Sequence, residues 1–488
     1  MTTVPRPAVR LGSFLGLEAQ RALLQNRAIR LAFILFSCAL IIAQQASFLL
    51  ARSEPDPFYR NVLNLGASYQ RYFAFYYYFH GFPVNLDNQK TRSLEEMEAT
   101  LTRLGPRLTP ERDVYNRASI FLFYPDAYWK GRPDTAEMRT GLAICFTLAL
   151  LAVFAASCDI GLPLFGLLVA LLCGSDPFQV YELYHWSSST IFPTVISTGL
   201  LTIAIALVLS NMRRGRRGTL AFVLVAAAGA LCSLQYEVRL EGVGVFIGLL
   251  ASLLCCSRHS KMTKAAYICL FIGSMIATNV ALDIHFKSSF ERANAIVARY
   301  GGRPADSGNA YYATQWWALW SGLGDFDEKY GFLADDRAGI SYYYGHGAPA
   351  PSEAIHRRNY IGTILNDPVW FVGIIRDRLT RVLLENTPYR LSLGPESVDI
   401  KVSPTIVTVL GVVLLLTSAV VYGKERLNLF ILPLSIGLVS VGQLADYGLQ
   451  FYAIAHLFLF AYVACCLMEL PLQFIPGLVP RASRSSIS

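Results

Sequence analysis

Two acidic residues, Glu54 and Asp56, stand shortly after the first long apolar run of the chain. A carboxylate in such a place can act as a general base, because a hydroxyl or amide group must lose a proton when it attacks a carbon centre. The surrounding sequence Glu-Pro-Asp-Pro also favours a plain polar turn that ends a helix. Catalysis and a turn therefore both stay open, with Asp56 the stronger candidate for the base.

Arginine side chains offer the complementary chemistry, since a guanidinium group stabilises the negative charge of a phosphate. Arg239 lies between Glu237 and Glu241 in a short connection between apolar runs, so it can contact a phosphate or pair with either acid. Arg376 and Arg378 belong to a stretch whose apolar residues recur at helical spacing. They can hold a pyrophosphate or anchor the stretch to lipid headgroups.

Other polar and aromatic residues have the types that bind sugars. Trp320, Asp335 and Asp336 lie in a stretch rich in Trp, Gly and Asp. Aromatic faces can pack on a sugar ring there, and carboxylates can accept hydrogen bonds from its hydroxyls; the alternative is a folded loop with an interfacial aromatic belt. Glu182 and His185 lie in another short connection as further substrate contacts. His185 can be a second base, a metal ligand or simply a hydrogen-bonding ring.

The elements that must position these residues are long apolar runs. The chain of 488 residues is 54% hydrophobic and 16% charged, and residues 31–50 carry no charge over a length that can cross a hydrocarbon layer of about 30 Å. We predict about ten transmembrane helices. The other runs are 141–157, 160–173, 191–209, 220–234, 243–256, 265–282, 404–421, 429–441 and 451–467. The runs 160–173, 243–256 and 429–441 are short for a crossing, so these helices would tilt, extend into flanking residues or not cross.

Basic residues indicate the orientation of these helices. Lys and Arg gather in the N-terminal tail, in alternate short connections such as 213–217, and in the C-terminal tail, whereas 174–190 and 442–448 contain none. Basic residues in short connections mark the cytoplasmic side. The pattern predicts an inner (plasma) membrane protein with both termini cytoplasmic. It also explains the net charge of +8 without a nucleic-acid partner.

The predicted fold class is an all-α polytopic membrane protein with about ten transmembrane helices and two large extracytoplasmic loops that bear interfacial helices. The predicted order begins with a cytoplasmic tail (1–30), a first span (31–50) and a first outer segment (51–138). Six spans (139–282), a second outer segment (283–402), three spans (403–468) and a second cytoplasmic tail (469–488) follow. Interfacial helices are predicted at 69–83, 93–104 and 368–384. The outer segments contain no cysteine, which excludes a disulfide framework and a cysteine metal site there.

Ionisable groups are scarce within the predicted spans, and His456 in the last span is the clear exception. An ion-coupled transporter normally places charged or strongly polar groups near the midplane of the bilayer. The sequence therefore favours a site at the outer surface. Gln44 and Gln45 are two further strongly polar side chains within a span. We predict that both hydrogen-bond to neighbouring helices.

This arrangement resembles the GT-C superfamily of integral membrane glycosyltransferases. The resemblance lies in a first span that leads directly into an acidic outer loop with surface helices, followed by many spans and a later outer domain. Members carry an acidic residue just after the first span, and Glu54 and Asp56 match it in the order Glu-Pro-Asp rather than as adjacent acids. The resemblance implies contact with membrane lipid, a polyprenyl-phosphate-linked sugar as donor, and a glycan, lipid or protein acceptor at the outer face. Which acid would act, and whether a divalent cation takes part, stay open.

Two other functions fit parts of the sequence. A lipid-linked glycan polymerase or ligase would use an arginine-rich outer site and would need neither Glu54 nor Asp56. A non-enzymatic lipid-linked glycan flippase or transporter would need a polar path through the spans, for which the sequence offers few groups. A nucleotide-sugar donor has no support, because no glycine-rich phosphate loop follows a predicted strand.

Overall fold

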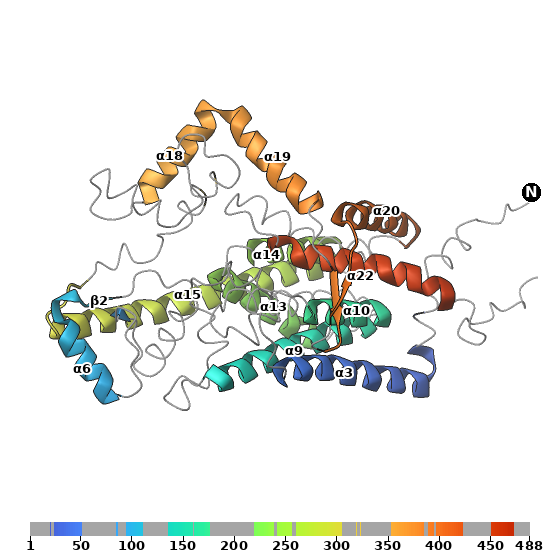
Figure 1. Cartoon of the computed structure of the whole chain (residues 1–488), viewed down its shortest axis with the longest axis horizontal. Coiled ribbons are helices and arrows are strands. Elements are labelled where there is room, and N and C mark those ends of the chain that lie inside the picture. The colour runs from blue at the N-terminus through green and yellow to red at the C-terminus, as the bar shows by residue number, and fades with distance from the viewer. Residues whose placement is uncertain are drawn as a thin grey trace, which may run out of the picture.

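The computed structural model describes the chain in separate stretches, which are mostly helical (Figure 1). The described residues are 20, 24–50, 84–85, 94–110, 135–159, 161–175, 219–238, 242–255, 260–304, 319, 323, 353–384, 389–394, 397–422 and 450–472. Their helices are α3 (Arg27–Leu50), α6 (Leu94–Leu104), α9 (Thr135–Asp159), α10 (Pro163–Gly174), α13 (Thr219–Val238), α14 (Gly242–Cys255), α15 (Lys261–Arg299), α18 (Glu353–Asn366), α19 (Pro368–Leu384), α20 (Pro404–Tyr422) and α22 (Gln450–Leu472), with a short 3-10 turn, η1 (Gly105–Arg107).

The apolar runs coincide with helices wherever the structure describes them. Runs 191–209 and 429–441 lie outside the described residues. Run 160–173 begins before the first residue of α10, and run 243–256 ends one residue after α14; each of the other predicted runs falls within one helix. By length and composition, α3 and α15 can each cross a membrane, and several other helices contain shorter apolar stretches. The shortest, α10, has 12 residues and a length of about 18 Å, which falls short of a full crossing. The number of ten spans stays a prediction.

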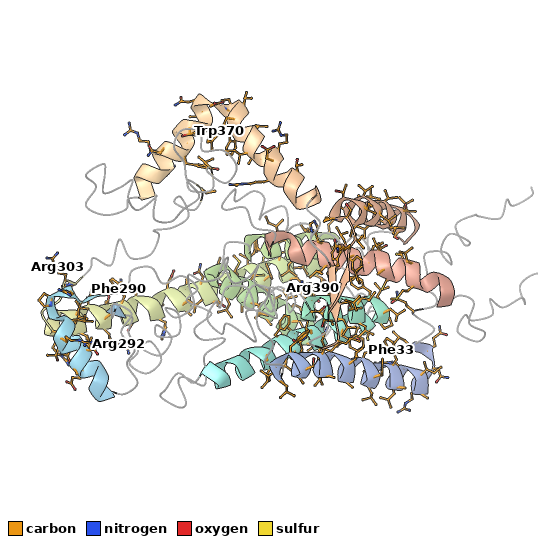
Figure 2. All side chains as sticks on the ribbon, in the orientation of Figure 1. Phe33, Phe290, Arg292, Arg303, Trp370 and Arg390 are labelled. Atoms are coloured by element: carbon orange, nitrogen blue, oxygen red, sulfur yellow. The ribbon has the colours of Figure 1, made fainter. Side chains whose placement is uncertain are left out.

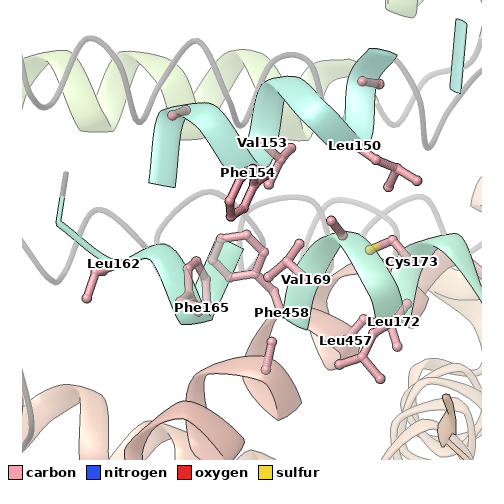
Figure 3. Close-up of a cluster of buried hydrophobic side chains, with 14 of the residues drawn as sticks. Leu150, Val153, Phe154, Leu162, Phe165, Val169, Leu172, Cys173, Leu457 and Phe458 are labelled. Atoms are coloured by element: carbon pink, nitrogen blue, oxygen red, sulfur yellow. The ribbon is translucent and has the colours of Figure 1, made fainter. Parts of the chain in front are cut away.

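Helix α10 forms the centre of the main hydrophobic core. It contacts α3, α9 and α22, and Figure 3 shows Phe165 of α10 beside Phe458 of α22, with Phe154 of α9 nearby. The rings of Phe165 and Phe458 meet edge to face with centroids 4.8 Å apart, an arrangement that aromatic quadrupoles favour. The turn from α9 into α10 passes through Gly161 at φ 83°, a left-handed conformation that glycine adopts without a steric penalty.

Helix α15 is longer than its apolar run. The prediction ends the span at residue 282, whereas the helix continues to Arg299, over 39 residues and about 58 Å. Charged residues such as Asp283 and Lys287 end the apolar run but do not end the helix. The start of the second outer segment is therefore a rigid extension of a core helix.

The stretch after α15 contacts the stretch after α6, so the two predicted outer segments meet there. Leu108, the residue after η1, is fully buried. Phe290, Ala293 and Val297 of α15 are buried as well. The amide of Arg303 donates to the carbonyl oxygen of Leu108 at 3.0 Å. Figure 2 labels Phe290 and Arg303 at this junction beside α6.

The described chain is mostly helical, as the all-α expectation has it, and two short antiparallel strand pairs were not predicted. Strand β1 (Val84–Asn85) pairs with β2 (Thr109–Pro110), and β3 (Tyr389–Ser392) pairs with β4 (Ser397–Ile400). In β3, Tyr389 is buried and the leucine two residues later packs on the main core. This alternation is the pattern of a half-buried strand. The predicted segments 93–104 and 368–384 are helical, as α6 and α19, and their place at the membrane interface stays a prediction. The predicted helix 69–83 lies outside the described residues.

Candidate functional site

The structure describes two of the predicted site residues, Arg376 and Arg378, both on α19. The other candidates lie outside the described residues. They are Glu54, Asp56, Glu182, His185, Arg239, Trp320, Asp335 and Asp336. What the structure does describe is the framework around them: the end of the helix that precedes Glu54, and the parts of the second outer segment that reach it.

The last turns of α3 carry the two glutamines, which are almost completely buried at 1% and 3% exposure. The Nε2 atom of Gln44 donates to the carbonyl oxygen of Leu171 in α10 at 3.0 Å and to that of Ser392 in β3 at 2.6 Å. The Nε2 atom of Gln45 donates to the carbonyl oxygen of Gly174 at 3.0 Å. The prediction that both glutamines hydrogen-bond to a neighbouring helix is confirmed. The bond to β3 was not predicted.

A serine at the end of α10 makes a parallel connection to the same strand. The hydroxyl of Ser175 donates to the carbonyl oxygen of Arg390 in β3 at 2.8 Å, and it lies 2.7 Å from the carbonyl oxygen of Leu171. We call the side chains of Gln44, Gln45 and Ser175, with the carbonyl groups that they contact, the glutamine clamp. The clamp fixes the β3–β4 pair of the second outer segment to the end of α3.

Glycine at position 174 makes the glutamine clamp possible. A Cβ atom there would lie 2.5 Å from Oε1 of Gln44 and 2.6 Å from Nε2 of Gln45. Such distances are well below van der Waals contact, so any larger residue would displace both amides. The close approach of α3 and α10 therefore depends on the missing side chain, as small residues at helix interfaces often allow.

Strand β3 also offers a polar group that the sequence analysis missed. The ring of Tyr389 stacks on Phe460 of α22 with centroids 4.3 Å apart and planes 10° apart. Burial raises the pKa of its hydroxyl, so the group stays protonated. Within the described part of the chain this buried hydroxyl has no hydrogen-bond partner. A buried donor without a partner is unfavourable by about 1–3 kcal/mol, so a polar ligand atom or water beside Tyr389 would be stabilised.

Helices α18 and α19 form a hairpin that holds both arginines. The Oδ1 atom of Asp367 accepts from the amide of Trp370 at 3.1 Å and so caps α19. Inside the hairpin, Leu323, Tyr360 and Ile374 are buried together. The rings of Tyr360 and Phe371 meet at 87° with centroids 6.1 Å apart.

The two arginines of α19 have different surroundings. Arg376 is exposed, and its guanidinium lies 2.7 Å from the carboxylate of Asp377. Arg378 is buried at 5% exposure. Burial raises the pKa of Tyr360 to about 12, and the charge of Arg378 limits that rise. Because two residues are separated by about 200° around a helix, these arginines lie on opposite sides of α19 and would contact a phosphate separately.

The described residues contain no group of three or more His, Cys, Asp or Glu side chains that could hold a metal ion. Junctions between the outer segments rest instead on backbone and hydroxyl contacts, such as the 3.5 Å distance between the Tyr300 hydroxyl and Glu98. Apart from Arg376 and Arg378 within α19, the ionisable groups of the predicted site belong to stretches outside the described residues.

No family model matches the chain, and no curated protein matches it. Two solved structures of oligosaccharyltransferases from the archaeon Archaeoglobus fulgidus, the first of them named AglB, are similar to it. One, in complex with an inhibitory peptide and a dolichol-phosphate, has a TM-score of 0.44 and 11% identity over 90% of this chain and 50% of that chain. The other, tethered with an acceptor peptide containing the NVT sequon, has the same score and identity and is covered over 49%. The chain spans about half the length of these structures, and a TM-score of 0.44 does not establish a shared fold.

Proposed function

We propose that this chain is an integral membrane glycosyltransferase of the GT-C type. It moves a sugar from a polyprenyl phosphate to a glycan, lipid or protein acceptor at the outer face of the cell inner membrane, with both termini in the cytoplasm. The observation that carries the proposal is the pair of acids directly after α3, a helix whose end is bound to the second outer segment by the glutamine clamp. The β3–β4 pair, from the predicted second outer segment, is therefore bonded to the helix that leads into the predicted first outer segment.

The length of the intervening chain limits how far the acids can lie from the glutamine clamp. Gln44 is six residues from the end of α3 at Leu50, a distance of about 9 Å along the helix axis. Beyond Leu50, even a fully extended chain places Glu54 within about 14 Å and Asp56 within about 21 Å of the helix end. The chain length therefore limits both residues to within about 30 Å of Gln44, which is compatible with a site between the two predicted outer segments.

The proposed reaction needs one base and one group that stabilises charge. Asp56, or Glu54 in its place, accepts the proton of the acceptor hydroxyl or amide while the acceptor atom attacks the anomeric carbon. The bond between that carbon and the phosphate oxygen breaks, and the polyprenyl phosphate leaves with the electron pair. Arg239, Arg376 or Arg378, or a divalent cation, would stabilise the phosphate.

The remaining candidates have roles in binding the sugar. Trp320 would pack against the C–H face of the ring, and Asp335 and Asp336 would accept from its hydroxyls. Glu182 and His185 would contact the acceptor or the donor from the connection between two spans. These side chains are polar or aromatic and flank apolar runs, as a substrate that is part lipid and part sugar requires.

The test is the double variant Glu54→Gln with Asp56→Asn, made in the full chain. It is reconstituted in liposomes with the sugar-linked polyprenyl phosphates and the glycan, lipid and protein acceptors extracted from the cells that produce the protein. Release of free polyprenyl phosphate, measured by mass spectrometry, reports transfer whatever the sugar is. We expect a loss of about 10²-fold or more, because that is the usual contribution of a general base. The same substitutions at Glu111 and Asp113, which have the same spacing in the same outer segment, form the control. Full activity in the first variant would refute the mechanism.

A further inference from the structure

The apex of the α18–α19 hairpin exposes apolar side chains to the surroundings. Leu365 at the end of α18 is 75% exposed, and Val369 and Val372 in the first turns of α19 are 81% and 62% exposed. Ile361, one turn before Leu365, is also exposed. Figure 1 shows the two helices as the arms of a V whose apex points away from the other labelled helices.

This apolar face is separate from the packed interior of the hairpin. The interior side is held by Tyr360 and Ile374 and by the Asp367 cap described above. The exposed residues therefore belong to a second, outward face of a hairpin whose shape is already fixed. An ordered apolar face of this kind, on two helices at once, indicates a surface that binds something apolar.

Arginines stand behind the apolar apex on both arms. Arg357 and Arg358 are exposed on α18, and Arg376 is exposed on α19. Arg358 precedes Leu365 by seven residues and Arg376 follows Val369 by seven, a distance of about 10 Å along each helix. The carboxylate of Asp377, 2.7 Å from the guanidinium of Arg376, partly offsets the charge of that arginine.

We propose that the apex of the α18–α19 hairpin dips into the outer leaflet and that the arginines behind it bind the phosphates of anionic lipids. An apolar helix face typically enters the boundary of headgroups and acyl chains by about 5–10 Å, which places charges about 10 Å behind it among the phosphates. Helix α19 also contacts α20, an apolar helix predicted to cross the membrane, and Figure 1 shows α20 beside the end of α19 opposite the apex, so the hairpin extends from a predicted span. The proposal rests on the proposed membrane topology and not on sugar transfer.

The test measures depth directly. A fluorescent amino acid replaces Val369 in one full-length variant and Thr380, an exposed residue nearer the other end of α19, in a matched control. Each protein is reconstituted in phosphatidylcholine vesicles, with and without phosphatidylglycerol. Quenching by doxyl-labelled lipid reports contact with acyl chains, and quenching by iodide reports contact with water. We expect iodide to quench the probe at 369 about fivefold less than the probe at 380, and doxyl lipid to quench it more.

Each outcome decides one part of the proposal. Equal iodide quenching at both positions would show that the apex lies in water and would overturn it. Protection at 369 from both quenchers would mean that protein, such as a second copy of the chain, covers the apex, which would also overturn it. Phosphatidylglycerol should move the probe at 369 deeper into the bilayer, as increased quenching by doxyl lipid. The double variant Arg357→Gln with Arg358→Gln should abolish this increase; the same increase in that variant would refute the role of the arginines. Because no step requires transfer activity, an inactive protein with an inserted apex would contradict only the proposed function.

Discussion

The glutamine clamp and the apex of the α18–α19 hairpin both involve the second outer segment, but they differ in which kind of side chain is buried and which is exposed. In the clamp, polar amides are buried and their donors reach backbone carbonyl groups. At the apex, apolar side chains are exposed and charges stand behind them. A buried polar group is unfavourable unless it is paired, and an exposed apolar group is unfavourable unless something covers it. The comparison therefore separates a region that fixes the fold from a region that is complete only against another surface.

Alanine at Gly174 should have the largest effect on stability. The new methyl group would force both glutamine amides away from their carbonyl partners. We expect a loss of about 3 kcal/mol or more in the free energy of unfolding, from strain and unpaired polar groups together. The melting temperature of the purified chain in detergent measures it.

Gly373→Ala in α19 is the matched control, because a Cβ atom there has nothing within 4 Å. That variant should be neutral or more stable by about 0.5–1 kcal/mol, since alanine favours a helix over glycine. Equal melting temperatures for the two variants would show that a methyl group at Gly174 is tolerated as well as one at Gly373, which would contradict the tight packing of the clamp.

Leucine at Gln44 should have a smaller effect. It removes the donor to Leu171 and to Ser392 and leaves both carbonyl groups buried without that partner. We expect a loss of about 1–3 kcal/mol and faster hydrogen exchange in the β3–β4 pair, measured by mass spectrometry. Thr417→Ala serves as the control, because its exposed hydroxyl bonds within its own helix to Val413. If exchange in residues 389–400 stays the same, the clamp does not hold the strands.

The smallest expected effect is a pH dependence of the hairpin. Burial raises the pKa of Tyr360 from its ordinary value of 10.0 to about 12. Above pH 10 the unfolded chain loses this proton before the folded chain does, so stability falls as the pH rises from about 10 to about 12. The melting temperature should decline less steeply in Tyr360→Phe than in the parent chain over this range. Parallel declines would show that the phenol is not buried in solution.

Local patterns predicted most of the helices. The apolar periodicity of 368–384 gave α19 with its bounds, and the buried amides of Gln44 and Gln45 implied partners, because such groups are almost always paired. The sequence could not identify Ser392 as a partner of Gln44, because the two residues are 348 positions apart in the chain. The β3–β4 pair was missed although Tyr389 and the leucine two residues later alternate as strand residues do. A shared role at a pyrophosphate was considered for Arg376 and Arg378 because they are close in sequence. The helix places the two side chains on opposite sides of α19.

The position of a bound polyprenyl phosphate tests the proposed function most directly. An electron cryomicroscopy structure of the full chain in lipid, with a polyprenyl monophosphate added, would locate the phosphate relative to α3 and the glutamine clamp. We expect the phosphate at the outer end of α3, within about 10 Å of the carboxylate of Asp56 or Glu54, with room between them for the sugar and the attacking group. A phosphate bound elsewhere, with both carboxylates in bulk water, would contradict the proposed site.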